Sequence, residues 1–82
     1  MSKLIMAIPL DGYKMEVRFD DGIHGVVDLS TRLFGPVFEV LKDPCFFVQA
    51  KVEEFGALCW PNGADLAPDA LYEQLMDHAK GA

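Results

Sequence analysis

The chain has 82 residues, of which 51% are hydrophobic and 24% charged. This length supports one domain, residues 1–82, and the apolar content is sufficient for a packed core. The net charge is −6, and the seven Lys and Arg residues form no run, which disfavours direct nucleic-acid binding by this chain alone. Neither a membrane-spanning run nor a signal-peptide pattern is present. We therefore expect a cytoplasmic protein that does not bind membranes.

Three strands joined by two tight turns are predicted at the start of the chain. The apolar run Leu4–Leu10 is typical of an edge strand, and Asp11-Gly12 is a strong hairpin signal. Hydrophobic and charged residues then alternate over Tyr13–Phe19, the clearest period-two pattern in the sequence. After a turn at Asp20-Asp21-Gly22, a third strand is predicted over Ile23–Leu29. Together these segments predict an antiparallel meander with one buried and one exposed face.

The rest of the chain predicts a short helix, two strands and a longer helix. Pro36–Lys42 has apolar residues at helical spacing, and Asp43-Pro44 is expected to end that helix. Alternation predicts a fourth strand over Val48–Glu53, and Ala57–Trp60 suits a short fifth one. Pro68 suits the first turn of the last helix, whose predicted apolar stripe is Leu71, Tyr72, Leu75, Met76 and Ala79. The predicted class is α+β: a small curved antiparallel sheet in the order β-β-β-α-β-β-α, with a short middle helix and an amphipathic C-terminal helix.

No residues form a recognisable catalytic or metal-binding motif. His24 shares a strand face with Asp28 but lies about 13 Å from it at ~3.3 Å per residue, too far for a catalytic dyad. His78 lies near the end of the last helix and is expected at the surface. Cys45 and Cys59 are expected to be small buried residues with reduced thiols, with a disulfide between them left open. We predict no catalytic residues, no metal and no cofactor.

The segment Trp60–Asp65 is the one unusual feature. Its Pro61-Asn62-Gly63 suits a tight turn, and Asp65 could tie that turn to the start of the last helix. Trp60 would cover the edge of the core. The segment is either a rigid connector, which we favour, or a ligand-binding lip that acts with other polar residues. The candidate ligand- or partner-binding residues are Trp60, Asn62, Asp65, Asp28 and His24.

Several motifs along the chain are similar to those of a known family. They include Phe19-Asp20-Asp21-Gly22, Gly35-Pro36-Val37-Phe38 and Leu41-Lys42-Asp43-Pro44, and the most specific is Leu58-Cys59-Trp60-Pro61-Asn62-Gly63-Ala64-Asp65-Leu66-Ala67-Pro68. With these motifs the chain resembles the bacterial domain of unknown function 2442 family over nearly its whole length. The resemblance implies a small α+β domain without established catalytic residues. It also implies a genetic setting similar to one half of a two-gene cassette, reminiscent of toxin–antitoxin pairs.

Two functions follow as hypotheses. The favoured one is a small non-enzymatic interaction or regulatory module that pairs with itself or with a neighbour-encoded protein. The acidic composition and the missing catalytic motif favour it. The alternative is a small-ligand-binding or enzymatic domain that uses the Trp60–Asp65 loop.

Overall fold

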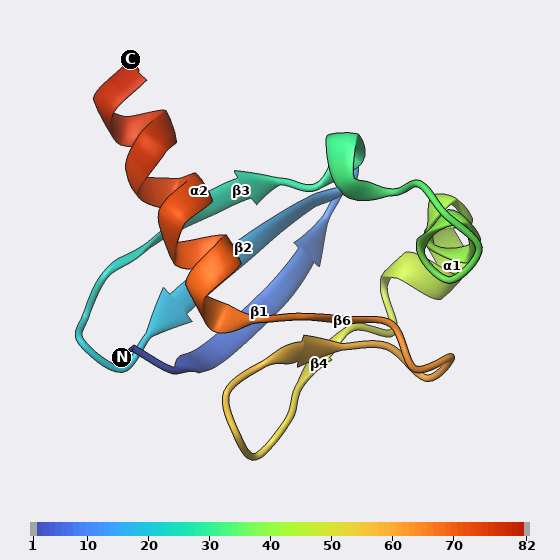
Figure 1. Cartoon of the computed structure of the whole chain (residues 1–82), viewed down its shortest axis with the longest axis horizontal. Helices are drawn as coiled ribbons and strands as arrows, with labels where there is room; N and C mark the ends of the chain where they lie inside the picture. The colour runs from blue at the N-terminus through green and yellow to red at the C-terminus, as the bar shows by residue number, and fades with distance from the viewer. Residues whose placement is uncertain (1, 82) are drawn as a thin grey trace.

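The computed structural model describes residues 2–81, and the side chains among them up to residue 77. It shows an α+β fold with two three-stranded antiparallel sheets and a C-terminal helix (Figure 1). The strands are β1 (Leu4–Leu10), β2 (Lys14–Phe19), β3 (His24–Asp28), β4 (Lys51–Val52), β5 (Leu58–Cys59) and β6 (Asp65–Leu66). The helices are the 3-10 turns η1 (Ser30–Arg32) and η2 (Phe38–Lys42), the one-turn helix α1 (Pro44–Phe47), and α2 (Pro68–Gly81).

The first sheet confirms the predicted meander. Its strand order is β1-β2-β3, and Val17 of β2 pairs with Ala7 on one side and Gly25 on the other. One face of the sheet is buried through residues such as Val17 and Phe19, whereas Arg18 and His24 are exposed on the other face. The alternation in the sequence therefore predicts which way the side chains of β2 point.

The second sheet differs from the prediction. The strands expected to extend one curved sheet form a separate sheet, in the order β4-β5-β6. The strand predicted over Val48–Glu53 is confirmed only at Lys51–Val52, and β6 was not predicted. Each of these strands has only two residues. In the β4–β5 turn, the carbonyl oxygen of Gly56 accepts a hydrogen bond from the Leu4 amide of β1 at 3.1 Å, which links the two sheets.

Helix α1 occupies a place where a helix stop was predicted. Asp43 is its N-cap, and the Asp43 carboxylate accepts a hydrogen bond from the Cys45 amide at 2.9 Å. Pro44 follows at the first helical position, where its missing N–H has no partner to lose. The 3-10 turn η2 ends at Lys42, as predicted for Asp43-Pro44, and the same Asp-Pro pair is also a favourable start for a new helix, which was not predicted.

The core lies between the two sheets and the helices. Its buried hydrophobic residues are Leu4, Met15, Val17, Phe19, Val27, Leu29, Leu33, Leu41, Phe47, Leu58, Trp60, Ala64, Leu71 and Leu75. Helix α2 packs close to β3: a Cβ built on Gly25 would lie 2.6 Å from Cδ1 of Leu75. Of the predicted α2 stripe, Leu71 and Leu75 are buried, Met76 is exposed, and Ala79 and the nearby His78 have side chains outside the described residues. No helix within residues 2–81 is long and apolar enough to cross a membrane.

Candidate interaction surface

The five predicted site residues do not form one site. Trp60 and Asn62 lie together in the turn after β5, and Asp65 lies on β6, opposite Cys59. His24 and Asp28 are exposed at the two ends of β3. Trp60 itself is buried in the core, so its ring is not available as the floor of an open lip.

The turn after β5 is closed by its own backbone and by one side chain. The Gly63 amide donates to the Trp60 carbonyl oxygen at 3.1 Å, and the Trp60 amide donates to the Ala64 carbonyl oxygen at 2.9 Å. Oδ1 of Asn62 accepts from the Ala64 amide at 3.1 Å. Asn62 therefore ties the turn locally. Asp65, which was predicted to tie the turn to the start of the last helix, lies on β6.

Three side chains from elsewhere in the chain hold the segment that contains η2 and α1. Nδ2 of Asn62 donates to the Val37 carbonyl oxygen at 2.9 Å, and Nε1 of Trp60 donates to the Phe47 carbonyl oxygen at 3.0 Å. Between them, the Tyr13 hydroxyl donates to the carbonyl oxygen of Lys42. We call these three hydrogen bonds the carbonyl clamps. They fix the backbone of residues 37–47 at its beginning, middle and end.

Tyr13 reaches its clamp position from an uncommon backbone conformation. Its φ is 61°, in the left-handed region that bulky residues rarely adopt. The ring packs edge-to-face on Phe47, with centroids 5.6 Å apart and an interplanar angle of 88°. The Tyr13 carbonyl oxygen also accepts from the Leu29 amide at 2.9 Å. Packing and hydrogen bonding thus hold a conformation that would be unfavourable in an isolated turn.

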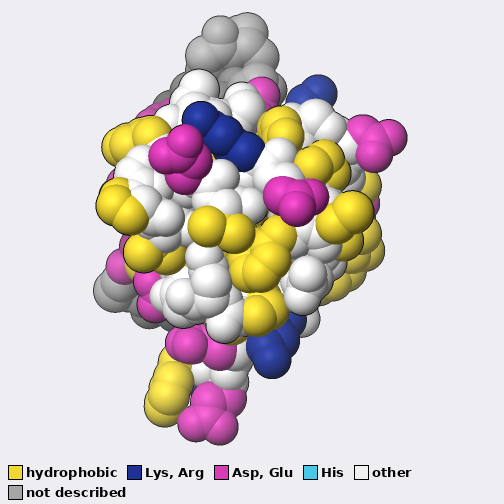
Figure 2. Space-filling model, turned by 90° about the vertical axis from the view of Figure 1, so that its right-hand side faces the viewer, with side chains coloured by type: hydrophobic (Ala, Val, Ile, Leu, Met, Phe, Trp, Pro, Cys, Tyr) yellow, Lys and Arg dark blue, Asp and Glu magenta, His cyan; other side chains and the backbone are white. Residues whose placement is uncertain are grey.

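The clamped segment and the residues on either side of it display hydrophobic side chains to solvent. Phe34 is 72% exposed, Val37 and Val40 are each 45% exposed, and Val48 is 59% exposed. We call these four residues the apolar surface. Figure 2 shows the end of the molecule that carries α1, where hydrophobic side chains gather among acidic ones. Exposed hydrophobic side chains that cluster on a small protein often mark a site of association.

A hollow of about 230 Å³ lies beside this surface, between the β1–β2 turn and α1. It is lined by the rings of Tyr13 and Phe47 and by Pro9, Pro44 and Val48. Cys45, on the same one-turn helix, is exposed, so its predicted burial was wrong; the short helix buries Phe47 instead. Cys45 and Cys59 are both free thiols, and Cys59 is half-buried.

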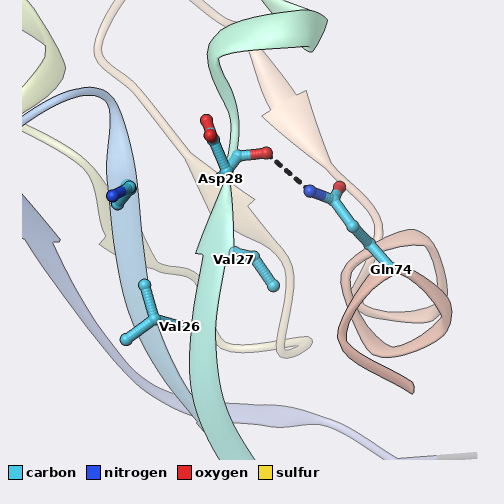
Figure 3. A pocket seen from close by; sticks show the side chains of 5 residues that line it. Val26, Val27, Asp28 and Gln74 are labelled. Carbon is cyan, nitrogen blue, oxygen red and sulfur yellow. Dashed lines mark hydrogen bonds between the residues drawn. The ribbon is translucent and has the colours of Figure 1, made fainter. Parts of the chain in front are cut away.

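The second hollow, of about 340 Å³, lies at the edge of β3 (Figure 3). Gln74 of α2 donates to the Asp28 carbonyl oxygen there and accepts from Nε of Arg32 at 2.7 Å. Ser30 hydrogen-bonds to the Asp28 carboxylate through its side chain and its amide, which lowers the pKa of Asp28 below its usual value. The ionised form of the Asp28 carboxylate is therefore stabilised by Ser30, two residues along the chain. Over the residues that the structure describes, no three His, Cys, Asp or Glu side chains come together to hold a metal ion.

Several residues that form the apolar surface, the carbonyl clamps and the hollow at β3 were not identified from the sequence. Tyr13, Gln74 and the exposed valines Val37 and Val40 belong to this group. Tyr13 lies at the start of the alternating segment Tyr13–Phe19. The alternation indicated that its ring is buried, but gave no sign that its hydroxyl bonds to the Lys42 carbonyl oxygen. Val37 fits the apolar spacing of a short helix, which predicts burial, but the 3-10 turn η2 buries only Leu41.

A family model for a protein of unknown function, DUF2442, matches residues 4–76. The chain belongs to the DUF2442 family. The match confirms the resemblance inferred from the motifs, and it spans both sheets, the clamped segment and most of α2 in this DUF2442 domain. No curated protein and no solved structure matches the chain.

Proposed function

We propose that this DUF2442 domain is a non-enzymatic interaction module that docks a partner protein on the apolar surface. One observation carries the proposal: three carbonyl clamps hold residues 37–47, which include η2 and α1, in place while hydrophobic side chains in this segment and beside it remain exposed. A core segment would bury those side chains. A segment held rigid with them outward is suited to bind another surface.

The clamps favour binding because the backbone is ordered before the partner arrives. Ordering a loop on binding reduces affinity, and a pre-ordered segment avoids that loss. Glu39, Lys42 and Asp43 are exposed in the same segment and would form a polar rim around the hydrophobic centre. With two acidic residues, one lysine and a net charge of −6 for the chain, the partner is expected to carry an apolar patch with basic residues around it.

The genetic setting implied by the family resemblance adds a candidate partner. We propose that the partner is the product of an adjacent gene, in a two-gene arrangement reminiscent of toxin–antitoxin pairs, and that the module regulates it by binding. The chemistry of the apolar surface agrees with protein docking and does not depend on which gene encodes the partner.

The alternative function, a small ligand at the Trp60–Asp65 loop, has less support. The indole N–H of Trp60 and the amide of Asn62 are both used in hydrogen bonds to the chain's own backbone. Asp65 is exposed on β6, whereas His24 and Asp28 are exposed at the two ends of β3, in the other sheet. A ligand that bound this loop would have to displace the clamps or use Asp65 without them.

Two exposed phenylalanines allow a matched test. Phe34 in the apolar surface is 72% exposed, and Phe55 in the β4–β5 turn is 71% exposed. The affinity of each variant for the co-expressed product of the adjacent gene is measured by titration calorimetry. Phe34→Asp and Val40→Asp should weaken binding at least ~10-fold, because each places a charge in the apolar centre, whereas Phe55→Asp should have little effect. Equal affinities for all variants, or a wild-type chain that does not bind the neighbouring product, would contradict the proposal.

A further inference from the structure

The outward face of the first sheet carries a charge pattern that is complementary to itself. Along β2 the outward residues are Lys14, Glu16 and Arg18, and the charge alternation continues to Asp20 in the following turn, where Oδ1 of Asp20 accepts from the Lys3 amide at 3.1 Å. The charges therefore run positive, negative, positive, negative. Read in the opposite direction, the same series places each charge against one of the opposite sign.

Hydrophobic side chains lie on both sides of this charged row. Glu16 pairs in register with Ile8 of β1 and Val26 of β3, and both of these are exposed. Arg18 pairs with Met6, which is half-buried, and with His24. Because α2 packs on the opposite, core-facing side of the sheet, this mixed face points to solvent.

We propose that two copies of this chain pack through these faces, around a two-fold axis that crosses β2 between Glu16 and Arg18. The axis runs across the strands, so the two β2 strands lie antiparallel. Glu16 of each copy then faces Arg18 of the other, and Lys14 faces Asp20. Met6 of one copy meets Ile8 of the second, which gives the charged contacts an apolar neighbour on the β1 side.

The charge pattern selects this arrangement over the other two-fold packing of the same face. An axis along β2 would place Lys14 over Lys14 and Glu16 over Glu16, and like charges across an interface are unfavourable. The row of charges is complementary to the same row running in the opposite direction, and an unrelated partner would match it only by coincidence. The occupant that the charges fit is therefore a second copy.

The pairs next to the axis are the ones to test. Packed sheets cross at about 30°, so residues far from the axis are displaced sideways more than residues close to it. Glu16 and Arg18 lie one residue from the axis, about 3.3 Å, whereas Lys14 and Asp20 lie about 10 Å away. The contact between Glu16 and Arg18 occurs twice in the dimer, so one substitution changes two contacts.

The experiment measures the dimer dissociation constant by sedimentation equilibrium. Glu16→Arg alone places two arginines together, and Arg18→Glu alone places two glutamates together. Each should weaken the dimer at least ~100-fold, because like charges across an interface are strongly unfavourable. The two variants mixed in equal amounts should form a heterodimer, since each arginine of one chain then faces a glutamate of the other. The double variant Glu16→Arg with Arg18→Glu should dimerise like the wild type.

A register control separates this contact from general charge attraction. Lys14→Glu changes the charge by the same amount as Arg18→Glu, but it keeps Arg18, which would face an arginine in a complex with Glu16→Arg. These two variants should therefore form little heterodimer, although Lys14→Glu can still dimerise with itself through Glu16 and Arg18. Circular dichroism verifies that each variant folds. A monomeric wild type, a dimer that survives both single substitutions, or equal rescue by Lys14→Glu would overturn the proposal.

Dimerisation and partner docking use different surfaces, so the two proposals fail separately. Glu16→Arg should bind the adjacent gene product as a monomer, and Phe34→Asp should remain a dimer. Loss of partner binding in Phe34→Asp with an unchanged dimer constant would support both assignments. Loss of dimerisation in Phe34→Asp would contradict the assignment of the dimer to the sheet face.

Discussion

The indole N–H of Trp60 donates to the carbonyl oxygen of Phe47 at 3.0 Å, and the two rings lie with their centroids 6.0 Å apart. This contact joins the turn after β5 to the end of α1. A residue that sequence reasoning placed at a sheet-to-helix connector thereby also determines where a distant surface segment lies. Each of the following predictions tests one such long-range contact.

Trp60→Phe should destabilise the protein by about 1–3 kcal/mol, because it removes the buried donor and leaves part of the indole volume empty. The measurement is urea unfolding followed by far-UV circular dichroism, which does not rely on the only tryptophan. Phe55→Leu, a change in an exposed ring, is the control and should alter stability by less than ~0.5 kcal/mol. Equal midpoints for the two variants would show that the Trp60 contact contributes little.

Asn62→Asp separates the two roles of the Asn62 side chain. The acidic side chain keeps an oxygen for the Ala64 amide but loses the Nδ2 donor to the Val37 carbonyl oxygen. The amide of Glu39, which donates to Gly35 near the released end, should exchange with solvent about tenfold faster. Hydrogen exchange by NMR measures this rate, with the Leu58 amide of β5 as an internal reference. Unchanged exchange at Glu39 would mean that the clamp does not hold this end.

Gly56→Ala should be more damaging than Gly35→Ala, although φ is +87° at both positions. The left-handed conformation alone costs a residue with a Cβ about 1–2 kcal/mol, and Gly35 has open space around it. At Gly56 the added Cβ would also lie 2.7 Å from Cβ and 3.1 Å from Cα of Lys3. Chemical denaturation should therefore show an extra loss of at least ~1 kcal/mol for Gly56→Ala. A similar loss for both variants would indicate that the Lys3 backbone moves away freely.

Asp21 and Tyr72 link stability to pH at both ends of the scale. The Ile23 amide, the Tyr72 hydroxyl and the Ser2 hydroxyl donate to the Asp21 carboxylate, which lowers the pKa of Asp21 below its usual 3.8. That stabilisation is present above about pH 4 and is lost as pH falls through the lowered value. The bond to Asp21 raises the pKa of Tyr72 above 10.0, so its stabilisation is present below about pH 10 and is lost as pH rises through the raised value.

Tyr72→Phe should therefore reduce the loss of stability on both acidification and alkalinisation. Urea midpoints at about pH 3, 7 and 10.5 measure the effect in wild type and variant. Glu73→Gln, which removes an exposed carboxylate one residue along α2, is the control and should keep the alkaline loss seen in the wild type. Parallel pH profiles for wild type and Tyr72→Phe would rule out the coupling.

The amino-acid sequence by itself determined the meander, the orientation of its side chains and the family. These depend on local rules: alternation sets the faces of β2, and Gly12 and Gly22 permit the turns on either side of it. The charge row on β2 is likewise readable from the sequence, once the strand is known to leave that face uncovered.

Only the tertiary structure decided the clamps and the exposure of the apolar surface. The partners Tyr13 and Lys42 are 29 residues apart, and Asn62 and Val37 are 25 apart, so no local pattern relates them. The apolar spacing of Phe34 and Val37 predicts burial, because a pattern records hydrophobicity and not whether another part of the chain is there to cover it. In this fold those side chains stay at the surface, because contacts between distant parts of the chain decide which hydrophobic residues are buried.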